Sequence, residues 1–307
     1  MKNNIDVSII IPTYNSSKTI KRAIKSVINQ TFTNWEIIIV DEFGSNTNFS
    51  FLNDKNFSSY KDRIILIKND KRLGSRESRN KGIRLSKAKY ISFLDADDEF
   101  LNNKIYTQIS FMENNKDFIG CGCQMQIYDN NHKTCTTDWH SLNEDVGYAT
   151  LIFSSLCWTS SIMFNRKKFM QYDLFPIYDV CEDYQMVSKC VMYGRFKNVG
   201  GVMVNYYYNG SNLSLNSEVI ENEKKYRVII TKNYLSRLKI KISNKNVYKF
   251  LLCNFNKYKQ ERNFFDVIKC KLLFIYLYFF AKNIDKKSLK HVLKQKYIEN
   301  YTYYSKK

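Results

Sequence analysis

Three carboxylates lie within four residues at Asp95-Ala96-Asp97-Asp98. Carboxylates this close repel one another unless a cation compensates their charge. They follow an apolar run at 90–94 that is typical of a buried strand, and open α/β sheets bind ligands beyond the carboxyl ends of their strands. The cluster therefore predicts oxygen ligands for a divalent ion that carries phosphates. The alternative is an acidic turn that caps the next helix.

Three more polar segments follow predicted strands or begin a predicted helix. Tyr14, in the segment 12–15, could stack on a nucleobase, and the alternative is an ordinary turn. The acidic side chains at 41–42 could accept a hydrogen bond from a base N–H or a ribose hydroxyl. Arg79, within the segment 73–82, suits a phosphate or a base carbonyl, and the alternative is an exposed helix start.

The elements that must position these segments alternate between strand and helix. β-Branched runs predict strands, and an apolar stripe at helical spacing predicts the first helix. Strand, helix and strand within the first 40 residues form a βαβ unit, so the chain is expected to be an α/β protein with its ligand site at one sheet edge. We expect strands at 7–11, 35–40, 63–67, 90–94, 118–128, 160–164 and 200–208, and helices at 20–28, 76–87, 104–114 and 182–193.

In order and spacing, these segments resemble the family-two nucleotide-sugar glycosyltransferases. The resemblance covers about residues 5–210 and implies the GT-A fold, a nucleotide-diphosphate sugar donor, a divalent metal (Mn²⁺ or Mg²⁺) and inversion at the anomeric carbon. Two features differ from the family pattern: Glu42 stands where a second Asp is usual, and the segment 206–211 lacks the family's late His. The motifs that carry the resemblance lie at 7–15, 29–32, 36–41, 78–82 and 93–98.

The resemblance also implies roles for individual residues. The uracil would lie against the first polar segment, the carboxylates after the second strand would read the base, and the basic segment would support base and phosphates. The acidic cluster would hold the ribose side and the metal. In chain order, the implied donor-binding residues are Pro12, Thr13, Tyr14, Asp41, Glu42, Arg79, Asn80, Asp95 and Ala96, and the implied metal ligands are Asp97 and Asp95.

An inverting transferase also needs a base that takes the proton of the acceptor hydroxyl. Glu182-Asp183, at the start of the predicted helix 182–193, resembles the family's acidic pair, and we assign the base to Asp183. Paired carboxylates raise one another's pKa, which helps a base to work near neutral pH. The alternative is an acidic pair that is favoured there only by the helix dipole.

The positive charge is concentrated in the last part of the chain. Residues 221–307 carry 22 Lys and Arg against 6 Asp and Glu, whereas residues 1–220 carry 26 against 23. We therefore expect a catalytic domain at 1–217 and a basic, aromatic-rich helical region at 218–307. This region could face an anionic membrane surface, and the alternative is a set of solvated helix faces.

The eight cysteines form no CxxC pair, which favours free thiols in a reducing compartment. No signal peptide is recognisable, and the longest apolar run, at 272–281, is shorter than the roughly 17–25 residues of a spanning helix. We therefore expect a cytoplasmic protein that is peripheral on the inner face of the membrane.

We expect a metal-dependent glycosyltransferase that moves a sugar from a UDP-sugar to a glycan or lipid-linked acceptor in surface polysaccharide synthesis. A nucleotidyltransferase would carry a Gly-rich phosphate loop with a Lys near the N-terminus, and residues 7–20 have none. A nucleic-acid-binding protein is disfavoured because the lysines of the last region follow long helical patterns without a recognition module.

Overall fold

The computed structural model describes residues 5–129, 132–137, 157–179 and 181–208, with residues 225, 226, 228 and 229. The chain divides into two compact units, one of Met1–Asp145 with Cys157–Asn212 and one of Val146–Leu156 with Leu213–Lys307. Almost all described residues belong to the first unit, whose fold is given below. The expected helical region 218–307 lies almost wholly outside the described residues and stays a prediction.

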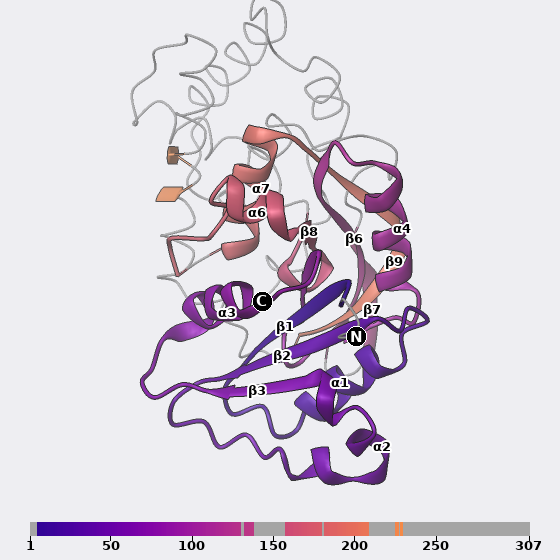
Figure 1. The fold of residues 1–307 in the computed structure, drawn as a ribbon, viewed down its shortest axis with the longest axis vertical. Helices are drawn as coiled ribbons and strands as arrows, with labels where there is room; N and C mark the ends of the chain where they lie inside the picture. Colours follow the sequence, from indigo (N-terminus) through magenta and orange to yellow (C-terminus); the bar gives the residue numbers. More distant parts are fainter. Residues whose placement is uncertain are drawn as a thin grey trace, which may run out of the picture. The chain divides into compact units, whose positions relative to one another are not determined.

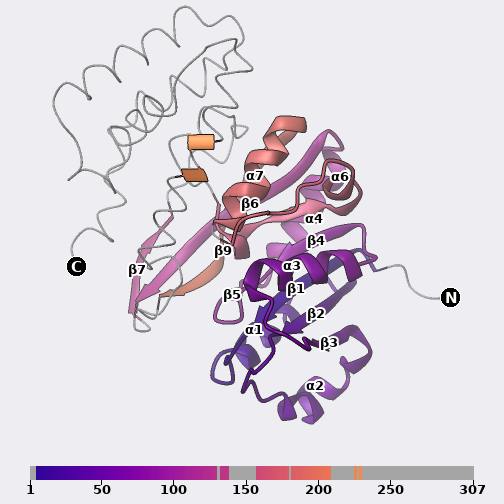
Figure 2. The same cartoon turned by 90° about the vertical axis from the view of Figure 1, so that its left-hand side faces the viewer.

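The first half of this unit is a parallel sheet with the strand order β3-β2-β1-β4 (Figures 1 and 2). Val and Ile favour extended backbone, and β1 and β2 are buried along nearly their whole length because both faces are covered. In the ladder Thr13 pairs with Asp41, so the two strands end together at one edge. The strands span Val7–Thr13 (β1), Trp35–Asp41 (β2), Ile64–Lys68 (β3) and Tyr90–Phe93 (β4).

Short helices connect these strands, and α3 packs on β1 and β2. Gly82 allows the close approach, since a Cβ at this position would lie 2.6 Å from Cγ2 of Ile10. The structure confirms the helix predicted at 76–87, although this helix begins and ends two residues earlier. The helical segments are α1 (Ile20–Ile28), η1 (Ser50–Asn53), α2 (Lys55–Ser58), η2 (Lys61–Arg63) and α3 (Gly74–Leu85).

The second half extends the sheet in the order β4-β8-β6-β9-β5, with β7 paired to β6. β6 and β9 are parallel neighbours and run as two long ribbons (Figure 2). The remaining elements are β5 (Glu99–Phe100), α4 (Lys104–Asn114), β6 (Phe118–Asp129), β7 (His132–Thr136), η3 (Thr159–Ser161), β8 (Met163–Asn165), α6 (Arg166–Gln171), α7 (Glu182–Tyr193) and β9 (Arg195–Tyr208).

The strand predicted at 160–164 was wrong in its first part. Residues Thr159–Ser161 form a 3-10 turn, and the strand begins only at Met163. The hydroxyl of Ser161 donates to the carbonyl of Trp158, and that of Ser160 donates to Asp98. Such side-chain hydrogen bonds compete with a strand ladder, which is why an apparently β-like run becomes a turn.

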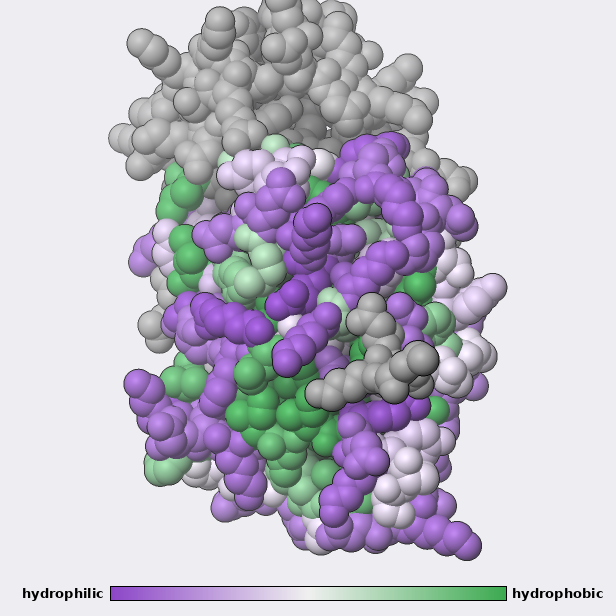
Figure 3. All heavy atoms as spheres, in the orientation of Figure 1, coloured by the Kyte–Doolittle hydropathy of each residue, from purple (hydrophilic) through white to green (hydrophobic). Residues whose placement is uncertain are grey.

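Aromatic side chains fill the core where the two halves of the sheet meet. The ring of Phe164 lies 6.5 Å from that of Phe93, 5.3 Å from that of Phe169 and 6.0 Å from that of Phe196. The face seen in Figure 3 is mostly hydrophilic, and its largest apolar area lies in the region of β2 and β3. This core supports the strand ends that carry the predicted site.

Lys104 of α4 is fully buried. Its Nζ donates to Oγ of Ser92 at 3.0 Å and to Oε1 of Gln108 at 2.7 Å, and it lies over the ring of Phe100. Burial lowers the pKa of the Lys104 ammonium to about 8.

This shift predicts a pH-dependent stability. Between about pH 8 and 10.5 the unfolded chain still holds the Lys104 proton while the folded chain has lost it, so the free energy of unfolding should rise with pH by about 3 kcal/mol. Lys104→Met should lose this rise. Urea unfolding at pH 7 and pH 10 measures it, with the exposed Lys25→Met as control. An equal rise in Lys104→Met would refute the assignment.

Candidate active site

The carboxyl ends of β1 and β2 present two buried polar atoms that have no hydrogen-bond partner among the described residues. They are Oγ1 of Thr13 and Oδ1 of Asp41. Burial raises the pKa of the Asp41 carboxyl above its ordinary value, against the hydrogen bond from Ser45. Since unsatisfied buried groups are costly, these neighbouring atoms are suited to a polar ligand.

Hydrogen bonds join the loops that follow these two strands. Asn15 has a left-handed backbone (φ 53°), its amide donates to Oγ of Ser45 at 3.1 Å, and its Oδ1 accepts from the amide of Asn46 at 2.8 Å. Asn tolerates this conformation better than most residues. Tyr14, beside this junction, is 44% exposed, with the guanidinium of Arg72 5.2 Å from its ring centre. Its ring is therefore accessible on a firmly held loop.

The carboxylate of Glu42 is engaged by the start of α3. It accepts from the amides of Leu73 (2.8 Å) and Gly74, and from the side chain of Asn69. Burial would raise the pKa of the Glu42 carboxyl, but these hydrogen bonds together lower it below its ordinary value. Within the pair 41–42, Asp41 is thus the residue whose carboxylate keeps an oxygen that no described residue contacts by a hydrogen bond.

Arg79 of α3 joins the two predicted acidic motifs, the cluster 95–98 and the pair 182–183. Its Nη2 lies 2.6 Å from Oδ1 of Asp95, and its Nη1 lies 3.0 Å from Oε1 of Glu182. Burial lowers the pKa of the Arg79 guanidinium, but the charges of both carboxylates outweigh burial and raise it overall. The acidic cluster 95–98 and the acidic pair 182–183 therefore lie on either side of one guanidinium.

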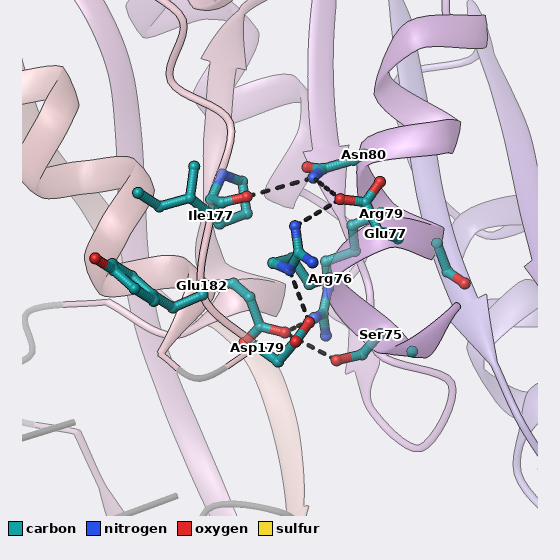
Figure 4. Close-up of polar contacts among 12 residues, drawn as sticks. Ser75, Arg76, Glu77, Arg79, Asn80, Ile177, Asp179 and Glu182 are labelled. Atoms are coloured by element: carbon teal, nitrogen blue, oxygen red, sulfur yellow. Dashed lines mark hydrogen bonds and ion pairs between the residues drawn. The ribbon is translucent and has the colours of Figure 1, made fainter. Parts of the chain in front are cut away.

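Residues 176–179, which precede α7, contact the first turns of α3 as well. Nε of Arg76 donates to Oδ1 of Asp179 at 2.7 Å, and Nδ2 of Asn80 donates to Glu77 and to the carbonyl of Pro176 (Figure 4). The predicted donor residue Asn80 thus holds this segment by its amide nitrogen, while its Oδ1 has no partner among the described residues.

The carboxylates of the acidic cluster 95–98 differ in their burial and in their hydrogen bonds. Asp98 is buried and accepts from Oγ of Ser160 at 2.5 Å and from the amide of Tyr207 at 3.3 Å, so it fastens the loop. Asp97 is partly exposed, and burial together with the charge of Asp95 raises the pKa of its carboxyl to about 6. The two remaining predicted donor residues, Pro12 and Ala96, are buried beside these groups in the chain.

Two residues at this loop were missed by the sequence analysis. Nη2 of Arg22 in α1 donates to the carbonyl of Asp97 at 2.5 Å, and its guanidinium lies 3.6 Å from the ring centre of Tyr207. Oγ of Ser160 accepts from the amide of Asp95 at 3.0 Å. Arg22 looks like an ordinary surface cation of an amphipathic helix and Ser160 like part of a strand, so no local signal could have found them.

Asp183 lies at the start of α7, as predicted, and is partly exposed. Burial is the largest cause that raises the pKa of its carboxyl to about 7, and the charge of Glu182 adds to it against the hydrogen bond from the amide of Tyr184. Cys181, just before the pair, has a left-handed backbone (φ 51°). A carboxyl with this pKa can act as a base near neutral pH.

The carboxylates of the acidic cluster are the candidate ligands for a divalent ion. No group of three or more His, Cys, Asp or Glu side chains in the described part of the chain is arranged to hold a metal. Mg²⁺, however, is commonly held by one or two carboxylates together with substrate phosphates and water. Asp95 and Asp97 repel each other, and no other described residue donates to the carboxylate of Asp97. These residues therefore fit an ion that arrives with a diphosphate.

None of the described helices has both the length and the apolar character needed to cross a bilayer. The predicted membrane-facing region lies almost wholly outside the described residues.

Comparison with solved structures shows the fold. The chain is similar to S. aureus TarS 1–349 in complex with UDP-GlcNAc, with a TM-score of 0.61 at 14% identity over 94% of this chain and 79% of that one. It is also similar to GalNAc-T7 with UDP, GalNAc and Mn²⁺, with a TM-score of 0.53 at 16% identity over 74% of this chain and 48% of that one. The expected α/β fold of GT-A type is confirmed.

Sequence comparison gives the family. The chain is 41% identical over 115 residues to the Escherichia coli protein UDP-Glc:alpha-D-GlcNAc-diphosphoundecaprenol beta-1,3-glucosyltransferase WfgD, over 37% of this chain and 44% of that protein. It thus spans less than half the length of that relative. The family model for glycosyl transferase family 2 matches residues 8–189. With the strand order and the motifs at the sheet edge, this match shows that the chain belongs to glycosyl transferase family 2.

Proposed function

We propose that this chain is a metal-dependent, inverting glycosyltransferase that moves a sugar from a UDP-sugar to a lipid-linked or glycan acceptor. The observation that carries the proposal is the double ion pair of Arg79. One guanidinium holds Asp95 of the donor motif and Glu182 of the base motif, so donor and acceptor chemistry share one site.

The base and ribose of the donor would occupy the ends of β1 and β2. Tyr14 would stack on the uracil, while Thr13 and Asp41 would satisfy its polar edge with the atoms that have no partner in the described part of the chain. Because the carboxylate of Glu42 is held by α3, its contribution would be to fix the start of that helix rather than to read the base.

The diphosphate would lie against the acidic loop, where Asp97 and Asp95 would hold Mn²⁺ or Mg²⁺. When bound, the ion neutralises the charge that develops on the leaving diphosphate, which is where transition-state binding accelerates the reaction. Arg22 and Ser160 hold the backbone of this loop and thereby keep the two carboxylates in position.

Asp183 would accept the proton of the acceptor hydroxyl. The hydroxyl oxygen forms the new bond to the anomeric carbon on the face opposite the diphosphate, and the bond from that carbon to the diphosphate oxygen breaks. The electron pair leaves with UDP, and the configuration of the anomeric carbon is inverted. A pKa of about 7 allows the carboxylate both to be ionised and to take the proton at neutral pH.

A lipid-linked acceptor is proposed because the E. coli relative is named for transfer to a GlcNAc-diphosphoundecaprenol. Such an acceptor lies at a membrane surface, and the net charge of +16 in residues 221–307 would attract anionic lipids. We propose a role in the synthesis of a surface polysaccharide.

The activity is tested with UDP-sugars and Mn²⁺. The purified chain should release UDP from one donor when a GlcNAc-diphospholipid is present, and NMR of the product should show a β-linkage from an α-linked donor. Retained configuration would contradict the mechanism. Failure to bind any uridine nucleotide would contradict the donor class.

Membrane binding is a separate prediction. The full chain should float with vesicles that contain anionic lipid at low salt and be released as salt rises, because screening weakens the attraction of the lysines. Neutral vesicles and a chain ending near Ser217 are the controls. Equal recovery of both chains with anionic vesicles would remove the proposed role of the basic region.

A further inference from the structure

We propose that Glu182 is a positioning residue that acts through Arg79 to hold the base-bearing end of α7 against the donor-side acidic loop. The inference rests on the proposed function and assigns a role that differs from that of Asp183. In this view Glu182 does not touch the reacting atoms. It holds the start of α7, which carries Asp183, at a fixed position relative to the acidic loop.

The contacts of Glu182 show why it can do so. A single carboxylate oxygen, Oε1, accepts from Nη1 of Arg79 at 3.0 Å and from Oγ of Ser75 at 2.8 Å. Both donors come from α3, a helix that is itself fixed to β1 and β2. The planar fork of Arg79 directs its other terminal nitrogen, Nη2, to Asp95 at 2.6 Å, so a movement of either carboxylate changes the geometry of the other.

Burial makes this link strong. The Arg79 side chain is only 8% exposed and that of Glu182 is 13% exposed, so water can replace neither partner readily. Removing one partner of a buried pair leaves an uncompensated charge, which is strongly unfavourable. By contrast, the Arg76–Asp179 pair joins the same two segments, but the Asp179 side chain is 72% exposed. The chain thus contains a matched pair of links, one buried and one open to water.

The link has an electrostatic consequence for Asp183. The groups that bear on its carboxyl are Glu182 of its own helix, Arg79 of α3, Asp95 of the acidic loop and the thiol of Cys157. Neutralising Glu182 removes a like charge and also leaves Arg79 with one counter-charge fewer. Both changes favour the ionised form of Asp183, so the activity should persist to lower pH.

The test compares Glu182→Gln, Glu182→Asp and Asp179→Asn in the full chain. In Glu182→Gln the turnover number should fall about 10-fold or more, because a misplaced base costs rate, and the acid limb of the pH–rate profile should move by roughly half a pH unit or more to lower pH. Glu182→Asp keeps the charge but shortens the reach, so turnover should fall with little shift of the limb. Asp179→Asn should change neither.

The outcomes separate the inference from the proposed function. A wild-type turnover and pH profile in Glu182→Gln would overturn the inference. It would also be overturned if Glu182→Gln melts like the wild type but is inactive at every pH while Asp183→Asn is active. Glu182 would then be the base. If Asp183→Asn is inactive and Glu182→Gln is unchanged, only the inference fails. If Glu182→Gln is unstable, Glu182→Asp decides the question. A turnover below that of Asp179→Asn supports the inference, and an equal turnover overturns it.

Discussion

Asp97→Ala is expected to abolish sugar transfer and to weaken the metal-dependent binding of UDP. Asp97 carries the carboxylate of the acidic loop to which no other described residue donates, so its removal takes away the ligand proposed to bridge ion and diphosphate. The fold should survive, since Asp98, rather than Asp97, fastens the loop to Ser160 and Tyr207. Calorimetric titration with UDP, with and without Mn²⁺, and a transfer assay measure the effect.

The control for this variant is Asp54→Ala, which removes an exposed carboxylate that pairs with Lys21. It should bind UDP and Mn²⁺ like the wild type. Full transfer activity in Asp97→Ala, or undiminished wild-type activity in excess chelator, would rule out the metal role. Loss of UDP binding in the absence of metal as well would indicate damage to the site rather than loss of a ligand.

Asp183→Asn is expected to lower turnover by about 10²–10⁴-fold, the usual contribution of a general base. Asn has nearly the same shape as Asp but cannot accept the proton of the acceptor hydroxyl. UDP affinity should stay nearly unchanged, because the residues proposed to bind the donor base are Thr13, Tyr14 and Asp41. Single-turnover assays with saturating donor and acceptor separate this effect from binding.

The pH dependence provides an independent check on the same residue. Burial raises the pKa of Asp183 to about 7, so the fraction of active base, and with it the wild-type rate, should fall as the pH drops through 7. Residual activity of Asp183→Asn should lack this acid limb. Unchanged turnover in both Asp183→Asn and Glu182→Gln, with product confirmed, would mean that the pair 182–183 is only a helix-start feature.

Much of the fold follows from local patterns. The Val and Ile runs of β1 and β2 predict strands covered on both faces, and the helices α4 and α7 begin and end where their periodicity predicts. The strand predicted at 160–164 was wrong in its first part because side-chain hydrogen bonds favour a turn there. Ser160 donates to Asp98, which is distant in the sequence, and Ser161 donates to the nearby carbonyl of Trp158.

The sequence by itself determined which residue types stand at the carboxyl ends of the strands, because strand, turn and acidic loop are encoded within a few residues of one another. Only the tertiary structure decided how they are paired. Arg79 meets Glu182 across 103 residues of chain and Arg22 meets Asp97 across 75, and no local pattern contains such contacts. Glu42 likewise carries a carboxylate that could bind a ligand, but the packing of α3 against β1 and β2 brings helix amides to this carboxylate. The physical reason is that hydrogen bonds and ion pairs form between groups that the packed core brings together, whatever their distance in the sequence.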